Sequence, residues 1–170
     1  MDSLRTIDRN KLAENQGGTV GMGSSGEELK LDVSSLEFSD SDDNRIPLSK
    51  FKGDVVILVG GQQKATEEAT KWDLELQKEC KSRKGIKVFG VAFVGKLPVF
   101  VPKRVVKKAL KDGPPFIDWD GIPIKTLGVV DKKLPYVFVI DKQGFLRFRM
   151  PGTFSEESLK EVLRFAEKLK

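Results

Sequence analysis

The chain has 170 residues, a net charge of +5 at pH 7, no histidine and one cysteine. This length supports one hydrophobic core and therefore one domain, and no apolar run approaches the ~20 residues that a transmembrane helix needs. The absence of imidazole and of a second thiol excludes histidine-based catalysis, zinc sites built from histidine or several cysteines, and an internal disulfide, so we expect no metal and no cofactor.

Charge and glycine content set the N-terminal region apart from the rest. Residues 1–44 contain ten acidic and four basic side chains, so the remainder is strongly basic and should attract anionic partners or this region itself. Residues 1–26 are rich in glycine with little apolar periodicity, which predicts a flexible acidic arm ahead of a domain spanning residues 27–170. No secretory signal is recognisable, which favours a cytoplasmic location.

The first elements after the arm are predicted to form a β-hairpin. Apolar residues nearly alternate through residues 29–38, as in an extended segment, and stop at the polar segment 40–44. The acidic and amide side chains of that segment resemble the first half of a calcium-binding loop, but Phe51 stands where the closing glutamate should be. A polar hairpin turn is therefore favoured over a calcium site.

Residues 55–94 show the pattern of a strand, a helix and a second strand. Residues 55–59 are continuously apolar and mostly β-branched, which is typical of a strand buried on both faces. Apolar side chains then recur at helical spacing along residues 65–80, and residues 86–94 form a second apolar run. This order predicts a right-handed crossover between parallel strands. Cys80 lies on the apolar stripe of the helix, so we expect a buried, unreactive thiol.

A short basic helix is predicted over residues 102–111. Its apolar side would consist of Val105, Val106, Ala109 and Leu110. Its other side forms a basic patch of Lys103, Arg104, Lys107, Lys108 and Lys111. A solvated helix face is the simplest interpretation, and an anionic ligand, bilayer surface or acidic protein is the alternative. Nucleic-acid binding is disfavoured because no aromatic side chains stand among these charges.

The segment 116–124 is too apolar for a solvated loop and contains Asp118, Trp119 and Asp120. Two carboxylates can perform acid–base chemistry when burial separates their pKa values, but positions in a surface turn are favoured here. Trp119 is expected to pack in the core or a loop, with a place in an apolar binding patch as the alternative.

The C-terminal part is predicted to be a hairpin followed by a helix. Residues 136–140 are continuously apolar, residues 145–149 alternate, and a turn separates the two runs. Ser155 is a helix N-cap followed by two glutamates, and apolar side chains recur at helical spacing through residues 159–169.

The order of these elements resembles the thioredoxin fold as found in redoxins, the peroxiredoxin and TlpA/ResA-like proteins. The similarity spans about residues 29–170 and rests on residues 46–53, 134–144 and 152–170. It implies an α/β three-layer sandwich, with a mixed central sheet of about four strands flanked by helices and an extra N-terminal β-hairpin. Residues 100–104 and 137–144 are also weakly similar to YtfJ-type periplasmic proteins, which implies a periplasmic location if a signal peptide has been removed.

Catalytic redoxins carry their Cys-x-x-Cys motif or peroxidatic cysteine directly after the first core strand, where a helix N-terminus stabilises a thiolate. Residues 60–66 occupy that position here and contain no cysteine. The resemblance therefore implies a redox-inactive module that binds a protein partner, as in an accessory subunit of a larger assembly, and a cis peptide bond before Pro135. The expected binding residues are Gly60, Gly61, Gln62, Gln63, Lys64, Trp119, Leu134, Pro135 and Tyr136.

Three other functions are weighed against this one. Cys80 would be the catalytic residue of a single-cysteine peroxidase or reductase that uses an external thiol. The basic patch would hold an anionic ligand or nucleic acid. Gly60, Gly61 and Lys64 would cradle a phosphate, although their order matches neither the P-loop nor the Rossmann fingerprint.

Overall fold

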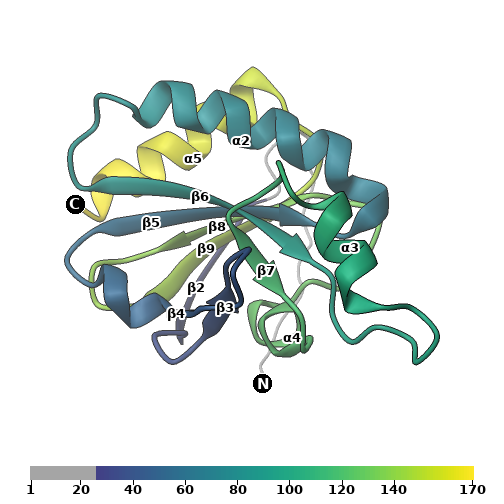
Figure 1. Cartoon of the computed structure of the whole chain (residues 1–170). Helices are drawn as coiled ribbons and strands as arrows, with labels where there is room; N and C mark the ends of the chain where they lie inside the picture. Colours follow the sequence, from purple (N-terminus) through teal and green to yellow (C-terminus); the bar gives the residue numbers. More distant parts are fainter. Residues whose placement is uncertain (1–25) are drawn as a thin grey trace.

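Strand β5 (Val55–Gly61) lies in the middle of the sheet, and all of its residues are buried. The computed structural model describes residues 26–170. These residues form an eight-stranded sheet in the order β2-β9-β8-β5-β6-β7-β3-β4 (Figure 1). The other strands are β2 (Glu27–Asp32), β3 (Glu37–Ser39), β4 (Arg45–Pro47), β6 (Ile86–Phe93), β7 (Phe116–Asp118), β8 (Tyr136–Ile140) and β9 (Phe145–Pro151). The helices are η2 (Leu48–Phe51), η3 (Gln63–Ala65), α2 (Thr66–Cys80), α3 (Lys103–Ala109), α4 (Ile122–Leu127) and α5 (Glu156–Lys168).

The pairing of the strands brings the ends of several elements to one edge. β5 is parallel to β6, which confirms the predicted parallel pairing, and β6 is parallel to β7. β8 is antiparallel to β5, β9 to β8, and β2 to β9. The predicted N-terminal hairpin is confirmed only in part: β3 pairs with β4 and joins the sheet beside β7, but the expected extended segment 29–38 is divided, because β2 lies at the opposite edge beside β9. The carboxyl ends of β5, β6 and β7 therefore meet the beginning of β8, and ligands of α/β sheets commonly bind at such an edge.

Helices cover both faces of the sheet, as expected. α2 and α5 lie on one face, around the completely buried Trp72, whose indole N–H donates to the Gly152 carbonyl at 2.9 Å (Figure 1). α4 and the β3 region cover the other face, where Phe38 and Leu127 are at most 1% exposed. α5 begins as predicted, since Ser155 Oγ accepts the backbone N–H of Ser158 at 3.0 Å. No helix within residues 26–170 combines the length and apolar character needed to span a membrane.

The acidic N-terminal region is only partly as predicted. Residues 1–25 lie outside the described residues, so the flexible arm remains a prediction. Describing that arm as acidic is wrong, because residues 1–26 contain three acidic and three basic side chains and the excess of negative charge lies in residues 27–44. This segment is folded, and its polar turn is confirmed. Asp40 Oδ1 accepts the backbone N–H groups of Asp42 at 2.8 Å and Asn44 at 2.9 Å.

The apolar side expected for the basic helix is only partly covered, since Val106 and Leu110 are half-buried while Val105 and Ala109 are exposed. α3 has seven residues and buries none of them, and Val105 is 56% exposed. Ion pairs also attach this helix, since the Asp43 carboxylate lies 3.5 Å from Lys103 Nζ and 2.9 Å from Lys107 Nζ. The hydrogen bond from Lys107 lowers the pKa of Asp43. Part of the basic patch therefore does bind the acidic N-terminal region.

The expectation of a cis bond before Pro135 is wrong as well. Among the described residues every peptide bond is trans. The trans form of an X–Pro bond is favoured by ~0.5–1 kcal/mol, and a proline just ahead of a strand removes no N–H from the ladder. The carbonyl of Pro135 accepts the backbone N–H of Gly152 at 3.0 Å.

Candidate binding site

The junction between β5 and α2 is the position at which a redoxin carries its reactive cysteine. Gly60 and Gly61 belong to β5 and are buried. A side chain at Gly60 would meet the ring of Phe93 and lie 2.8 Å from the Val91 carbonyl oxygen, and one at Gly61 would lie 2.8 Å from the Ala65 Cβ. Packing therefore explains both glycines without a phosphate.

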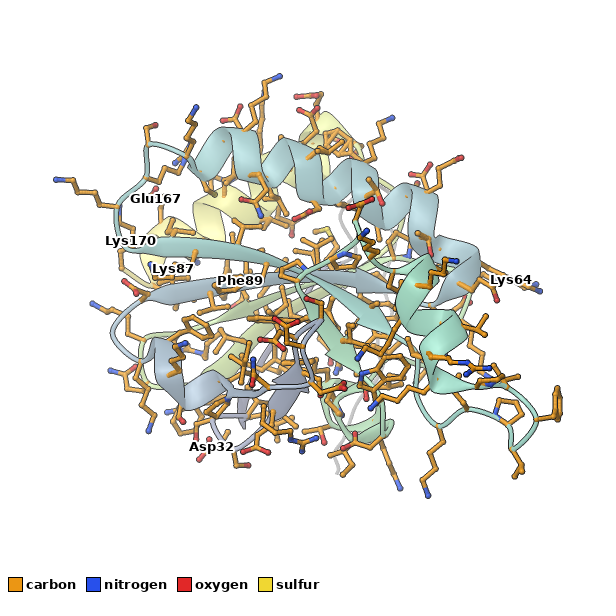
Figure 2. The ribbon with its side chains drawn as sticks, viewed as in Figure 1. Asp32, Lys64, Lys87, Phe89, Glu167 and Lys170 are labelled. Carbon is orange, nitrogen blue, oxygen red and sulfur yellow. The ribbon has the colours of Figure 1, made fainter. Side chains whose placement is uncertain are left out.

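The residues after Gly61 form the accessible part of this junction. Gln62 is half-buried, whereas Gln63 and Lys64 are exposed on η3, and Figure 2 shows Lys64 projecting from this end of the molecule. The Gln62 carbonyl accepts the backbone N–H of Ala65 at 2.8 Å, which fixes the entry into α2. No sulfur or imidazole is present at this helix terminus.

The beginning of β8 lies directly beside the junction, because Tyr136 is paired with Gly60. Tyr136 is 3% exposed, and its hydroxyl accepts the backbone N–H groups of Val130 at 3.2 Å and Asp131 at 3.0 Å. Its backbone lies between Gly60 and Pro151 in the sheet. The buried Pro135 and Tyr136 thus position the edge, while the half-buried Leu134 is accessible.

Trp119 does not join these residues. It follows β7, which is separated from β5 by β6, and its ring centroid lies 4.7 Å from Lys103 Nζ. The indole Nε1 is buried and has no hydrogen-bond partner among the described residues. Trp119 therefore contacts the basic helix rather than the junction.

A groove of about 260 Å³, which we call the α2 groove, lies beside the junction and was not predicted. It runs between the first half of α2 and residues 110–115. The strand residues that form its floor are Val59, Gly61, Gly90, Val91 and Ala92, three of which have little or no side chain. Its polar lining is Thr66, Thr70, Asp73 and Asp112, and its apolar lining includes Ala69, Leu74, Pro114 and Pro115.

The space in the α2 groove has an identifiable origin. A Cβ at Gly90 would lie 3.2 Å from Pro114 Cβ and 3.4 Å from Asp73 Oδ2, so any larger residue would fill it. In the sequence, the feature that could have indicated this groove is Gly90, a glycine inside the apolar run of β6. Glycine within a strand often marks the close approach of a ligand or another backbone.

Asp73 is the titratable group in the α2 groove with a perturbed pKa. Burial raises its pKa, although Gln77 Nε2 donates to Asp73 Oδ1 at 3.3 Å and opposes the shift. The carboxylate is thus incompletely compensated for its loss of water. A cation or a hydrogen-bond donor placed in the groove would supply the missing interaction.

Asp118 corrects another expectation, because it is buried rather than in a surface turn. Its Oδ1 accepts the backbone N–H of Gly121 at 2.8 Å, and its Oδ2 accepts that of Ile124 at 3.0 Å. Burial raises the pKa of Asp118 in spite of these bonds. Both oxygens therefore organise the start of α4, which gives Asp118 a structural role.

Cys80 is the last residue of α2 and lies about 21 Å from Thr66, the first residue of that helix, at the rise of an α-helix. It is 7% exposed, which confirms the predicted burial. Burial raises the pKa of the thiol, Glu167 and Glu79 raise it further, and Arg83 lowers it. Figure 2 shows Glu167 at the end of the molecule opposite Lys64. The thiol therefore lies far from the junction, and its raised pKa disfavours the reactive thiolate.

The architecture and the position of this site define a redoxin. The AhpC/TSA family matches residues 29–149, and the chain belongs to this family. A search of the curated proteins finds no significant match. The narrower similarity to YtfJ-type proteins remains a prediction.

Solved structures with the thioredoxin fold are similar over most of the chain. The exposed lipoprotein thioredoxin Etrx1 of Streptococcus pneumoniae has a TM-score of 0.58 and 22% identity, and the match covers 79% of this chain and 98% of that one. BsSco, a member of the Sco family of cytochrome c oxidase assembly proteins, has a TM-score of 0.59 and 14% identity, with 84% and 95% covered. A secreted thiol-disulfide isomerase from Corynebacterium glutamicum has a TM-score of 0.56 and 20% identity, with 90% and 98% covered. At these identities the similarity establishes the fold.

Proposed function

We propose that this chain is a redoxin without thiol chemistry that binds a segment of a partner protein in the α2 groove. The observation that carries the proposal is the combination of a cysteine-free junction with an open groove directly beside it. Gln62, Gln63, Lys64 and Leu134 form the accessible rim of the same edge.

The absence of chemistry follows from the residues at the junction. Thiol–disulfide exchange requires a thiolate, and the amide side chains of Gln62 and Gln63 cannot replace it. Cys80 has a raised pKa and lies at the other end of α2, so it cannot take over this role from its position. The arrangement retains the surface of a redoxin and lacks its nucleophile.

The lining of the α2 groove suggests the kind of segment that it would hold. Glycine and alanine on its floor leave room for one or two small apolar side chains, and Leu74, which is 63% exposed, would be covered by them. Asp73 and Asp112 carry negative charge on the lining. A partner segment with a lysine or arginine next to small apolar residues satisfies both features.

Selection from a displayed library of random peptides, followed by calorimetry, tests this proposal. We expect enriched peptides to contain a basic residue beside small apolar residues, and to lose about tenfold or more in affinity on Asp73→Asn, because a charge-assisted contact is removed. The matched control is Glu75→Gln, which makes the same charge change on the same helix outside the groove lining.

A second variant, Thr70→Trp, should block the groove and abolish binding, since Thr70 is an exposed residue of its lining. Peptides whose affinity is unchanged by both Asp73→Asn and Thr70→Trp, or a library that yields no binder, would overturn the proposal.

A further inference from the structure

The connection between β6 and α3 presents apolar side chains to solvent. Val99 is 105% exposed and Phe100 is 84% exposed, and Val105 on α3 is 56% exposed. Figure 1 shows this connection projecting from the body of the molecule beside α3. We call Val99, Phe100 and Val105 the apolar tip.

Local structure does not explain Val99 and Phe100. The backbone N–H of Val101 donates to the Pro98 carbonyl at 2.9 Å, so Val99 and Phe100 are the two central residues of a β-turn. Such positions are normally occupied by glycine, proline, asparagine, aspartate or serine, because these residues adopt the turn backbone easily and most of them are polar or small enough to face solvent. Pro98 and Pro102 flank the turn and restrict its backbone, so the apolar side chains are held outward in a defined conformation.

The charges around the apolar tip all have one sign. Residues 95–111 contain six lysine or arginine residues and no acidic residue. Lys103 and Lys107 bind Asp43 and attach α3 to the body. The remaining four are exposed and have no ion pair among residues 26–170, namely Lys96, Arg104, Lys108 and Lys111.

The outer side of α3 combines both properties. Arg104, Val105, Lys108 and Ala109 are exposed, whereas Val106, Lys107 and Leu110 are half-buried toward the body. Apolar side chains that insert between lipid headgroups, surrounded by cations that bind anionic lipid, are the features of proteins that lie on a membrane surface.

We propose that the apolar tip and the free cations of residues 96–111 dock this protein on an anionic lipid bilayer. A bilayer accepts a projecting turn without a shaped counterpart. Its anionic headgroups also complement residues 95–111, which contain six basic residues and no acidic one. Nucleic acid would use the charges and stack a base on Phe100, but it would leave Val99 and Val105 exposed. Val99, Phe100 and Val105 are not part of the α2 groove lining, and neither are Arg104 and Lys108, so variants of these residues test docking independently of the groove proposal.

Co-sedimentation with vesicles tests the docking. We expect the full chain to bind phosphatidylcholine vesicles that contain about 30 mol% phosphatidylserine, and to bind pure phosphatidylcholine vesicles only weakly. Binding to the anionic vesicles should weaken as the salt concentration increases. Arg104→Glu with Lys108→Glu should lower the partition coefficient at least about thirtyfold, and Val99→Ser with Phe100→Ser at least about tenfold.

Two control variants make equivalent substitutions at exposed residues outside the proposed docking surface. Lys132→Glu with Lys133→Glu makes the same change in net charge, and Ile122→Ser with Val130→Ser removes side chains that are 58% and 86% exposed. Both controls should bind like the unmodified chain. Equal losses in test and control variants, or no binding to anionic vesicles, would overturn the proposal.

A fluorescence measurement locates the contact. The emission of a Phe100→Trp variant should shift to the blue on addition of anionic vesicles, whereas that of a Val130→Trp variant should not. Concentration-dependent dimerisation without lipid, abolished by Val99→Ser with Phe100→Ser, would instead identify the tip as an interface between two copies and would contradict membrane docking.

Discussion

Helices α2 and α3 occupy similar places in the chain, since each follows a strand of the parallel part of the sheet, yet different forces hold them. α2 buries Trp72 and Leu76 completely against the sheet. α3 buries no residue and is attached through Asp43, Lys103 and Lys107. Helical periodicity therefore predicts where a helix forms, but not whether anything covers its apolar side. The covered helix supports the α2 groove, and the uncovered one leaves apolar surface for an external contact.

The largest expected effect is the loss of the α2 anchor. Trp72→Ala should lower the free energy of unfolding by about 3–5 kcal/mol, because it leaves a cavity and removes the hydrogen bond to Gly152. Val105→Ala on α3 should change it by less than about 0.5 kcal/mol. Urea denaturation followed by circular dichroism measures both values, and similar losses for the two variants would contradict the distinction between the helices.

α4 provides a third case, in which hydrogen bonds to a buried carboxylate hold the helix. Asp118→Ala should cost about 2–3 kcal/mol, because it leaves the backbone N–H groups of Gly121 and Ile124 without their acceptor. Asp120→Ala is the matched control and should cost under about 1 kcal/mol, since its carboxylate accepts one exposed bond from Ile122. Equal costs in the same denaturation experiment would show that Asp118 does not organise this segment.

Replacing the carboxylate of Asp73 or Asp43 by an amide should shift the Tm slightly, and in opposite directions. The folded-state pKa of Asp73 is raised by burial, so its ionised form opposes folding at pH 7 and Asp73→Asn should raise the Tm. As the pH falls through this raised pKa, Asp73 is protonated in the folded protein before it is protonated in the unfolded chain. The difference in Tm between Asp73→Asn and the unmodified chain should therefore narrow.

Asp43 provides the opposite case beside α3. Its folded-state pKa is lowered, so its stabilisation is fully present above the unfolded value and is lost as the pH falls through the folded value. Asp43→Asn should therefore lower the Tm at pH 7 and have little effect in acid. Differential scanning calorimetry across this range checks both variants, and a Tm for Asp73→Asn that falls at pH 7 would show that its carboxylate is well compensated.

Local patterns in the sequence were sufficient for much of the fold. The apolar run of β5, the stripe that includes Trp72 and the N-cap at Ser155 each predict an element from neighbouring residues alone. They succeed because the element is stabilised by contacts whose residue types and spacing are visible in the chain.

The candidate site was less predictable because it depends on contacts between distant residues. The α2 groove exists because Gly90 faces Pro114 and Asp73 from different elements. The burial of Asp118 depends on N–H groups supplied by the start of α4. The isomer of Pro135 was taken from the family resemblance rather than from this chain. Whether another element covers Val105 depends on tertiary structure, and within residues 26–170 Val105 stays 56% exposed.

A binding role without thiol chemistry requires that Cys80 is unreactive in the folded protein. The most direct measurement is the rate of Cys80 alkylation as a function of pH and urea. We expect labelling of the native chain to be at least about a hundredfold slower than that of the unfolded chain and to accelerate as urea opens the structure. Rapid labelling of the native chain near pH 6, independent of urea, would contradict this account and would support an enzyme that uses Cys80.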